Sequence, residues 1–402
     1  MTNAVLTQNL WFNRGFLILL SSTVLVGLGG KIFNLALPLI VYELTQSSTW
    51  MGWMRAVEYL PNLLLALFIG VWVDHFDRKQ WAMVMLGMQS VLFLVICWLV
   101  FQSGDYLWAL FPIAFLLNAC NYGYGNAKMG IQKNVLMPEH QGLAIARLSG
   151  VSTLLETAGP FLSGLLLLVS GFFWPMAGSG ILFFLALLVF SRLPWQHQPS
   201  PSKLSVFESL KGGWVALKQN RPLWLISLAV IVVNTTSGIF DIQIIFAARD
   251  YLKLNPAQIG FLASCAGGFA FLGTWLTPYI RQQLGLGRTL IGALALEALA
   301  FVIPVWQGDY AGYMVALSLA GFFGVMANIC IWSYRQESTP SQVFGRVAGI
   351  TGSIFKLGLP FGLAMSGYIV NYAGIDKLFF FCAIIQWIVV VWLIFTVVRT
   401  LR

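Results

Sequence analysis

Twelve long apolar runs divide this chain, and they constrain its fold more than any other feature. A helix that crosses a bilayer takes roughly 20 residues, which is about the length of each run. Charged residues make up only 9% of the chain, against about 25% in a soluble domain. We therefore predict an all-α membrane protein of about twelve spanning helices, which begin near Phe16, Trp50, Trp81, Leu107, Ala146, Phe172, Leu223, Ala257, Thr289, Tyr310, Val347 and Leu378.

One polar interruption is much longer than the others and divides the chain into two parts. Residues 192–221 carry prolines at their start and basic residues later. We expect residues 1–191 to form one six-helix bundle, 192–221 a cytoplasmic linker, and 222–402 a second six-helix bundle. The later part of the linker, 204–217, has the pattern of an amphipathic helix that lies on a membrane surface.

Lysine and arginine are distributed unevenly between the two sides of the predicted spans. With the N-terminus inside, the external segments hold only Arg249, Lys253 and Lys377. Cytoplasmic loops of membrane proteins are enriched in Lys and Arg, so this bias predicts a multi-pass protein of the inner (cytoplasmic) membrane with both termini in the cytoplasm. It also accounts for the net charge of +9 without a nucleic-acid partner.

Weak similarity between the two parts indicates an internal repeat. Three matches follow one another in the same order in both parts: Ile32-Phe33-Asn34 with Ile239-Phe240-Asp241, Gly52 with Gly260, and Glu156-x3-Pro160 with Lys356-x3-Pro360. Such symmetry is typical of transporters built from two similar halves.

Polar residues follow helical spacing in the first, fourth, seventh and tenth runs. Spacing of three, four and seven residues places them on one face of each helix, and such a face must contact protein or water rather than lipid. One interpretation is a shared water-filled cavity, and the alternative is hydrogen bonding between packed helices. The residues are Gly27, Lys31 and Asn34; Asn118, Asn121, Tyr122 and Gly125; Asn234, Ser237 and Asp241; Asn328, Trp332 and Arg335.

Seven ionisable residues fall within the predicted spans: Lys31, Arg55, Glu58, Glu156, Asp241, Glu297 and Lys356. Arg55 and Glu58 are three residues apart and can pair on one helix. Lys31 and Asp241 need partners because an isolated charge in a membrane is costly, and one arrangement pairs them with each other.

Two motifs resemble those of the major facilitator superfamily. Gly70, Asp74, Arg78 and Lys79 resemble its gating motif after the second helix, and Gly159-Pro160 resembles the glycine-proline motif of its exporters. Residues 32–45, 70–79 and 138–164 are most similar to the branch that contains enterobactin exporters and macrolide efflux proteins. This resemblance implies two pseudo-symmetric six-helix bundles and transport by alternating access. It also implies that the ninth run, which carries Glu297, lies at the periphery, so Glu297 is not expected to act in transport.

The expected function is export of a small organic molecule, a siderophore or drug, by proton antiport. Uptake of a nutrient or metabolite and flippase-like lipid transport remain alternatives. Neither a phosphate-binding loop, a metal-ligand pattern nor a catalytic constellation is apparent, so we expect a monomeric protein without cofactor, metal or enzymatic activity. The candidate substrate and proton site comprises Lys31, Asn34, Arg55, Glu58, Asn118, Asn121, Tyr122, Glu156, Asn234, Asp241, Asn328, Trp332 and Lys356.

Overall fold

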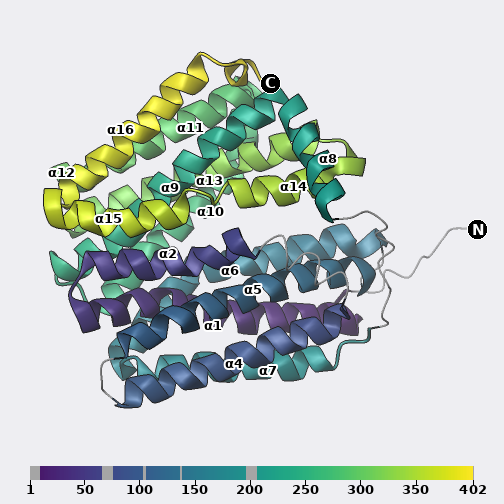
Figure 1. Ribbon diagram of the computed structural model, residues 1–402, viewed down its shortest axis with the longest axis vertical. Helices are drawn as coiled ribbons and strands as arrows, with labels where there is room; N and C mark the ends of the chain where they lie inside the picture. The colour runs from purple at the N-terminus through teal and green to yellow at the C-terminus, as the bar shows by residue number, and fades with distance from the viewer. Residues whose placement is uncertain (1–9, 66–75, 103–105, 136–137, 196–205, 402) are drawn as a thin grey trace, which may run out of the picture.

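The computed structural model describes residues 10–65, 76–102, 106–135, 138–195 and 206–401, and most of them are helical (Figure 1). Ten helical segments in these ranges are long and apolar enough to cross a membrane. The helices α2 (Ser48–Leu64) and α5 (Leu107–Val135) pack among the spans of the first bundle and complete it. The described ranges contain no strand. The prediction of an all-α membrane protein with about twelve spanning helices is therefore confirmed.

The helices follow the predicted runs, with two interruptions. The first bundle contains α1 (Arg14–Thr45), α2 (Ser48–Leu64), α4 (Arg78–Gln102), α5 (Leu107–Val135), α6 (Pro138–Ser170) and α7 (Phe173–Ser191). The second contains α9 (Arg221–Asp250), α10 (Pro256–Leu284), α11 (Leu286–Ala300), α12 (Ile303–Trp306), α13 (Tyr310–Ser338), α14 (Ser341–Ile354), α15 (Leu359–Ala373) and α16 (Ile375–Ile394). The pairs α11–α12 and α14–α15 each form one interrupted span. Between the bundles, α8 (Val206–Gln219) packs against α14.

Several helices begin at a side-chain cap. Lipid offers no hydrogen bonds to the backbone, so a spanning segment satisfies its own polar groups by forming a helix. The first N–H groups of a helix still lack partners inside it. Asn13 accepts a hydrogen bond from the Phe16 N–H at 3.0 Å, and Asn220 accepts one from Leu223 at 3.2 Å. At the start of α10, Asn255 and Gln258 form a reciprocal capping box. These polar residues mark where the helices begin.

A cluster of three phenylalanines lies in the core of each bundle. In both clusters the ring centroids of contacting pairs are 4.5 to 5.5 Å apart, which is typical of favourable aromatic packing. The clusters use corresponding helices, so the internal repeat extends to the core. They are Phe33, Phe93 and Phe183 in the first bundle, and Phe240, Phe301 and Phe379 in the second.

The two bundles meet mainly along two helix pairs, α6 with α10 and α2 with α15. Small residues allow these helices to approach closely. A Cβ atom on Gly52 of α2 would lie 2.5 Å from the Leu363 carbonyl oxygen of α15, and one on Gly260 of α10 would lie 2.4 Å from the Pro160 carbonyl oxygen of α6. Both glycines are therefore required for the observed contact between the bundles.

Polar contacts reinforce this contact at the end of the molecule where α1 ends and α2 begins, which we name the α1–α2 end. Arg249 of α9 forms an ion pair with Glu43 of α1. Nearby, the Tyr42 hydroxyl donates to Asp250 at 2.7 Å. The Ser48 hydroxyl lies 3.1 Å from the Asn371 side-chain oxygen across the α2–α15 contact. The bundles are thus joined by side chains at this end.

The opposite end, where α6 and α14 begin, is packed more loosely between the bundles. Among the described residues, no atom lies within 4 Å of a Cβ built on Gly150 of α6 or on Gly349 of α14. The structure therefore differs between its two ends, closed at the α1–α2 end and more open at the opposite end.

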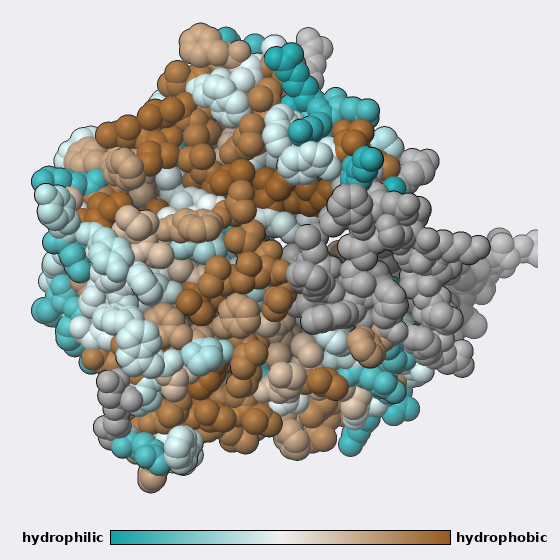
Figure 2. All heavy atoms as spheres, viewed as in Figure 1, coloured by the Kyte–Doolittle hydropathy of each residue, from teal (hydrophilic) through white to brown (hydrophobic). Residues whose placement is uncertain are grey.

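The surface has the pattern of a protein surrounded by lipid. Figure 2 shows hydrophobic residues over the middle of the visible face and hydrophilic residues near its left and right edges. The helices run from left to right in the same view (Figure 1), so on this face the hydrophobic belt lies over their middle sections. Large exposed apolar side chains such as Trp98, Leu166 and Ile388 belong to this belt by type and exposure. A belt of this kind matches the hydrocarbon core of a bilayer.

Candidate functional site

Several predicted polar residues are exposed although they lie in the middle of spanning helices. Asn34, Asn121, Asp241, Asn328 and Trp332 are exposed, whereas many of their neighbours along the helices are buried. Asn34 and Asp241 come from the equivalent helices α1 and α9, and Asn121 and Asn328 come from α5 and α13. Tyr122 is half-buried on α5. Asn34 and Asp241 are separated by the same number of residues as Asn121 and Asn328. These positions therefore belong to the internal repeat.

Arg55 and Glu58 of α2 form the ion pair that their spacing predicts. The guanidinium Nη1 lies 3.0 Å from Glu58 Oε2, and Glu58 is almost completely buried. Asn118 of α5 approaches the other carboxylate oxygen at 3.5 Å and donates at 3.1 Å to the Ala114 carbonyl. Arg55 also lies close enough to Asp241 of α9 for electrostatic attraction. This cluster therefore brings charged groups of both bundles into proximity.

Lys31 pairs with Glu156 of α6, which corrects the interpretation that pairs it with Asp241. The ammonium group contacts the carboxylate, and the lysine stem passes directly over Gly159. A Cβ atom on residue 159 would lie 2.8 Å from Lys31 Cγ. The glycine of the Gly159-Pro160 motif thus leaves the space through which Lys31 reaches Glu156. The sequence could not show this because the two helices are more than one hundred residues apart.

Glu297 of α11 is buried in the interior of the second bundle. Its side chain is 4% exposed. One carboxylate oxygen accepts from the Ser237 hydroxyl at 2.8 Å, and the other accepts from the Gln386 amide at 3.0 Å. Its charge also lies within electrostatic range of Asp241. The signal in the sequence was that Glu297 and Gln386 each interrupt an otherwise apolar run.

Asn234 and Lys356 lie at the interruption between α14 and α15. The Asn234 amide of α9 donates to the Phe355 carbonyl at 2.8 Å, where the interrupted helix leaves this carbonyl without its usual partner. Lys356 donates to Asn62 of α2 at 3.2 Å, across the contact between the bundles. The structure therefore gives Asn234 a packing contact, and it places Lys356 next to α2.

Three cations in or next to the spanning helices, Lys128, Arg335 and Lys356, have no acidic partner among the described residues. The Lys128 ammonium donates to the Thr23 hydroxyl at 2.6 Å, and Lys356 donates to Asn62. Arg335 is 3% exposed, donates to Thr351 at 3.0 Å and stacks over the Trp332 ring at 3.8 Å. Its Nε atom is buried and has no hydrogen-bond partner in the part of the chain that the structure describes. The chain spacing that relates Asn121 to Asn328 also relates Lys128 to Arg335, so these two cations occupy repeat-related positions.

Part of the predicted gating motif, Gly70 and Asp74, lies outside the described residues. The two basic residues that follow contact the first bundle. Arg78 packs against α5 at Gly130, and the Lys79 ammonium donates to the Leu193 carbonyl after α7 at 2.9 Å. Both contacts connect the start of α4 to its neighbours at the opposite end.

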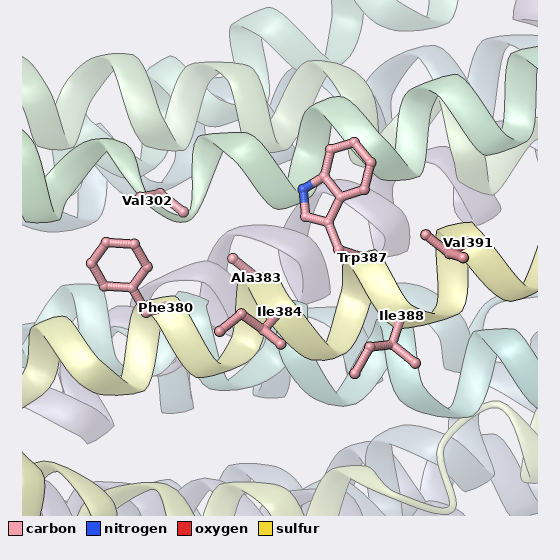
Figure 3. Close-up of a pocket in the computed structure, with 7 residues that line it drawn as sticks. All are labelled: Val302, Phe380, Ala383, Ile384, Trp387, Ile388 and Val391. Atoms are coloured by element: carbon pink, nitrogen blue, oxygen red, sulfur yellow. The ribbon is translucent and has the colours of Figure 1, made fainter.

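A hollow of about 410 Å³ on the side of the second bundle is unsuited to a charged ligand (Figure 3). Its walls are apolar apart from the Trp387 ring nitrogen, and several of them, such as Ile384 and Ile388, are exposed in the hydrophobic belt. Lipid or detergent chains would fill a surface of this kind. The lining residues are Val302, Phe380, Ala383, Ile384, Trp387, Ile388 and Val391.

Comparisons with known proteins agree with this architecture. The chain is 23% identical over 382 residues to the multidrug efflux pump Tap of Mycolicibacterium fortuitum, covering 90% of this chain and 91% of Tap. It is 24% identical over 374 residues to the enterobactin exporter EntS of Salmonella typhimurium, covering 89% and 84%.

Solved structures show the same fold. A bacterial homologue of the iron transporter ferroportin, in an inward-facing state, superposes with a TM-score of 0.74 at 15% identity, covering 95% of this chain and 99% of that chain. The nucleoside transporter NupG superposes with a TM-score of 0.74 at 12% identity, covering 94% and 98%. The family model of the Major Facilitator Superfamily matches residues 19–363. This protein belongs to the Major Facilitator Superfamily of membrane transporters.

Proposed function

We propose that this protein exports a small organic molecule by proton antiport with alternating access. The observation that carries the proposal is the pair of interior acids, Asp241 and Glu297, which lie within electrostatic range of each other. Asp241 is exposed between the helices, whereas Glu297 is buried and has only the neutral partners Ser237 and Gln386. A membrane-buried carboxylate without a cation is costly, and binding a proton removes that cost. Such a pair is suited to carry a proton.

The difference between the two ends supports the direction of transport. If the Lys and Arg distribution orients the chain, the closed α1–α2 end faces outward and the looser opposite end faces the cytoplasm. In this state, the polar residues between the bundles would be loaded from the cytoplasm, as export requires. Residues 1–191 and 222–402 are then the two units that rock against each other, in the inner membrane with both termini in the cytoplasm. Relatives that include an efflux pump and a siderophore exporter favour this direction.

The unpaired cations favour a substrate with an anionic group. Lys31 and Arg55 are each offset by a glutamate, so Lys128, Lys356 and Arg335 remain to attract a carboxylate or a phenolate. Trp332, which stacks on Arg335, offers an exposed aromatic surface. An aromatic anion, such as a catechol-containing siderophore, would satisfy both features, and an acidic hydrophobic drug would do so as well.

The test uses inside-out vesicles with a pH-sensitive dye in the lumen and a catecholate siderophore as the probe substrate. We expect siderophore addition to release luminal protons, and a protonophore to abolish siderophore accumulation even when ATP is supplied. Asp241→Asn and Glu297→Gln should each remove substrate-driven proton release. Asp376→Asn, at an exposed carboxylate at the start of α16, is the matched control and should behave as wild type.

Two outcomes would contradict the proposal. Accumulation that persists in protonophore-treated, ATP-supplied vesicles would exclude proton antiport. Accumulation that depends strictly on sodium would indicate that Asp241 and Glu297 bind sodium rather than a proton.

A further inference from the structure

A second hollow in the second bundle lies away from the contact between the bundles. It encloses about 1270 Å³ and is bounded by the end of α10, the start of α11, the last third of α13, the end of α16 and the chain after it. All of its described lining residues follow residue 276, so the first bundle contributes none. It therefore forms a site separate from the candidate transport site.

The cavity lies at the opposite end of the molecule. α10 runs from the α1–α2 end, where Pro256 contacts Gly164, toward Leu284, and α16 runs in the same direction from Ile375 to Ile394. The Lys and Arg distribution predicts that this end meets the cytoplasmic leaflet, which is rich in anionic lipids. The cavity is thus expected at the level of lipid headgroups.

The charges in the cavity are all positive. Arg281, Arg288 and Arg399 line it, and the described lining includes no acid. Arg281 donates to Glu337 at 2.7 Å, so a carboxylate offsets its charge. Arg288 and Arg399 are exposed and form no ion pair among the described residues. Two arginines are therefore free to bind anionic groups.

Backbone contacts hold these two arginines at one site. The chain after α16 turns through the 3₁₀ helix η2 (Val397–Thr400), and the buried Val398 anchors it. The Gly287 N–H, one residue before Arg288, donates to the Leu401 carbonyl at 2.9 Å. Arg399 thus lies on a segment that is hydrogen-bonded to the start of α11, so the arrangement does not depend on two flexible side chains alone.

The remaining lining has both the polar and the apolar groups that a phospholipid needs. Ser333, Thr396 and Thr400 offer hydroxyls, whereas Ile329, Ile394 and the exposed Phe395 form an apolar side. Arginines bind phosphate oxygens with paired N–H donors, and basic pockets between membrane helices on the cytoplasmic side bind anionic lipid headgroups. A free phosphate ion would use the arginines but not the apolar side.

We propose that this cavity binds the headgroup of an anionic phospholipid, with one phosphate near Arg288 and another near Arg399. Two phosphates joined by glycerol, as in cardiolipin, suit the two free arginines better than a single phosphate. The volume also exceeds the roughly 300–1,000 Å³ typical of a drug-sized ligand, which leaves space for a large headgroup. The proposal does not depend on which molecule the protein transports.

The test is native mass spectrometry of the purified protein with added cardiolipin, phosphatidylglycerol or phosphatidylcholine. We expect cardiolipin to be retained most strongly and phosphatidylcholine least. The double variant Arg288→Ala/Arg399→Ala should lower cardiolipin affinity by roughly thirtyfold, because each arginine contributes to lipid attraction. The variant Arg288→Lys/Arg399→Lys keeps both charges and should retain most of the binding, which also shows that the site tolerates substitution.

The matched control is Arg14→Ala/Arg221→Ala, which removes two exposed arginines from the same end outside the cavity. Equal loss of cardiolipin in the control would overturn the proposal, since binding would then reflect net charge. Equal retention of cardiolipin and phosphatidylcholine would also overturn it. Displacement of cardiolipin by millimolar inorganic phosphate would also overturn the proposal, because the cavity would then bind simple anions rather than a lipid.

Discussion

Lys31 of α1 forms an ion pair with Glu156 of α6 by passing over Gly159, which lies three residues further along α6. The ion pair thus depends on the glycine of the Gly159-Pro160 motif. Gly159 is followed by Pro160, whose carbonyl oxygen contacts α10 of the second bundle. The position of Lys31 is therefore coupled to the contact between the bundles.

Gly159→Ala should displace the Lys31 side chain and reduce transport, because the new Cβ would lie 2.8 Å from Lys31 Cγ. Transport can be measured in vesicles, with thermal unfolding as the check on folding. Gly178→Ala, at a position with no described atom within 4 Å, is the control and should transport normally. Equal activity of the two variants would show that the Lys31–Glu156 pair is dispensable.

Charge reversal separates pairing from substrate binding at the same residues. Lys31→Glu and Glu156→Lys should each impair transport because each leaves two like charges side by side. If pairing is the function of these residues, the double variant should recover much of the activity. A folded double variant that remains inactive would indicate that Lys31 acts on something other than Glu156.

Glu43→Ala/Arg249→Ala should weaken closure at the α1–α2 end, since the ion pair joins α1 to α9. An exposed ion pair contributes about 0.2–1 kcal/mol, so opening should rise by at most about fivefold. The measurement is maleimide labelling of Asn34→Cys from that side, after replacement of the five native cysteines. Lys253→Ala is the control, because Lys253 pairs with Asp250 three residues earlier in the same bundle and does not join the two bundles. Unchanged labelling would exclude a role in closure.

Gly260→Ala should prevent close contact between α10 and α6, because its Cβ would lie 2.4 Å from the Pro160 carbonyl oxygen. Oxidative cross-linking of Ser48→Cys to Asn371→Cys, which replaces a 3.1 Å contact, reports closure. We expect cross-linking to fall in this background but not with Gly268→Ala, whose nearest described atom would be 3.8 Å away. Similar cross-linking in both backgrounds would argue against the close approach.

Asn234→Leu should destabilise the protein by about 0.5–2 kcal/mol, because the Phe355 carbonyl loses its donor. Thermal unfolding in detergent measures this effect. Asn34→Leu is the comparison, since Asn34 is exposed and forms no hydrogen bond among the described residues. It should change stability by less than about 0.5 kcal/mol and affect transport instead. A loss of stability with Asn34→Leu but not with Asn234→Leu would contradict the structural role of Asn234.

The sequence by itself determined the membrane-spanning architecture. With 9% charged residues, most of the chain must be solvated by lipid, and lipid requires helices because the backbone has no other source of hydrogen bonds. Local spacing was also sufficient for the Arg55–Glu58 pair, since residues three apart on a helix are neighbours. The similarity of Ile32-Phe33-Asn34 to Ile239-Phe240-Asp241 likewise anticipated the two corresponding bundles.

Only the tertiary structure decided how charges on different helices pair. The position of Lys31 on its own helix is compatible with a pair to Glu156 or to Asp241. The side chain pairs with Glu156 because Gly159 leaves space for it. Glu297 could not be placed because a single acid in an apolar run has no periodic pattern, and its partners Ser237 and Gln386 come from two other helices. Such pairings depend on helix rotation and close approach, which distant parts of the chain determine together.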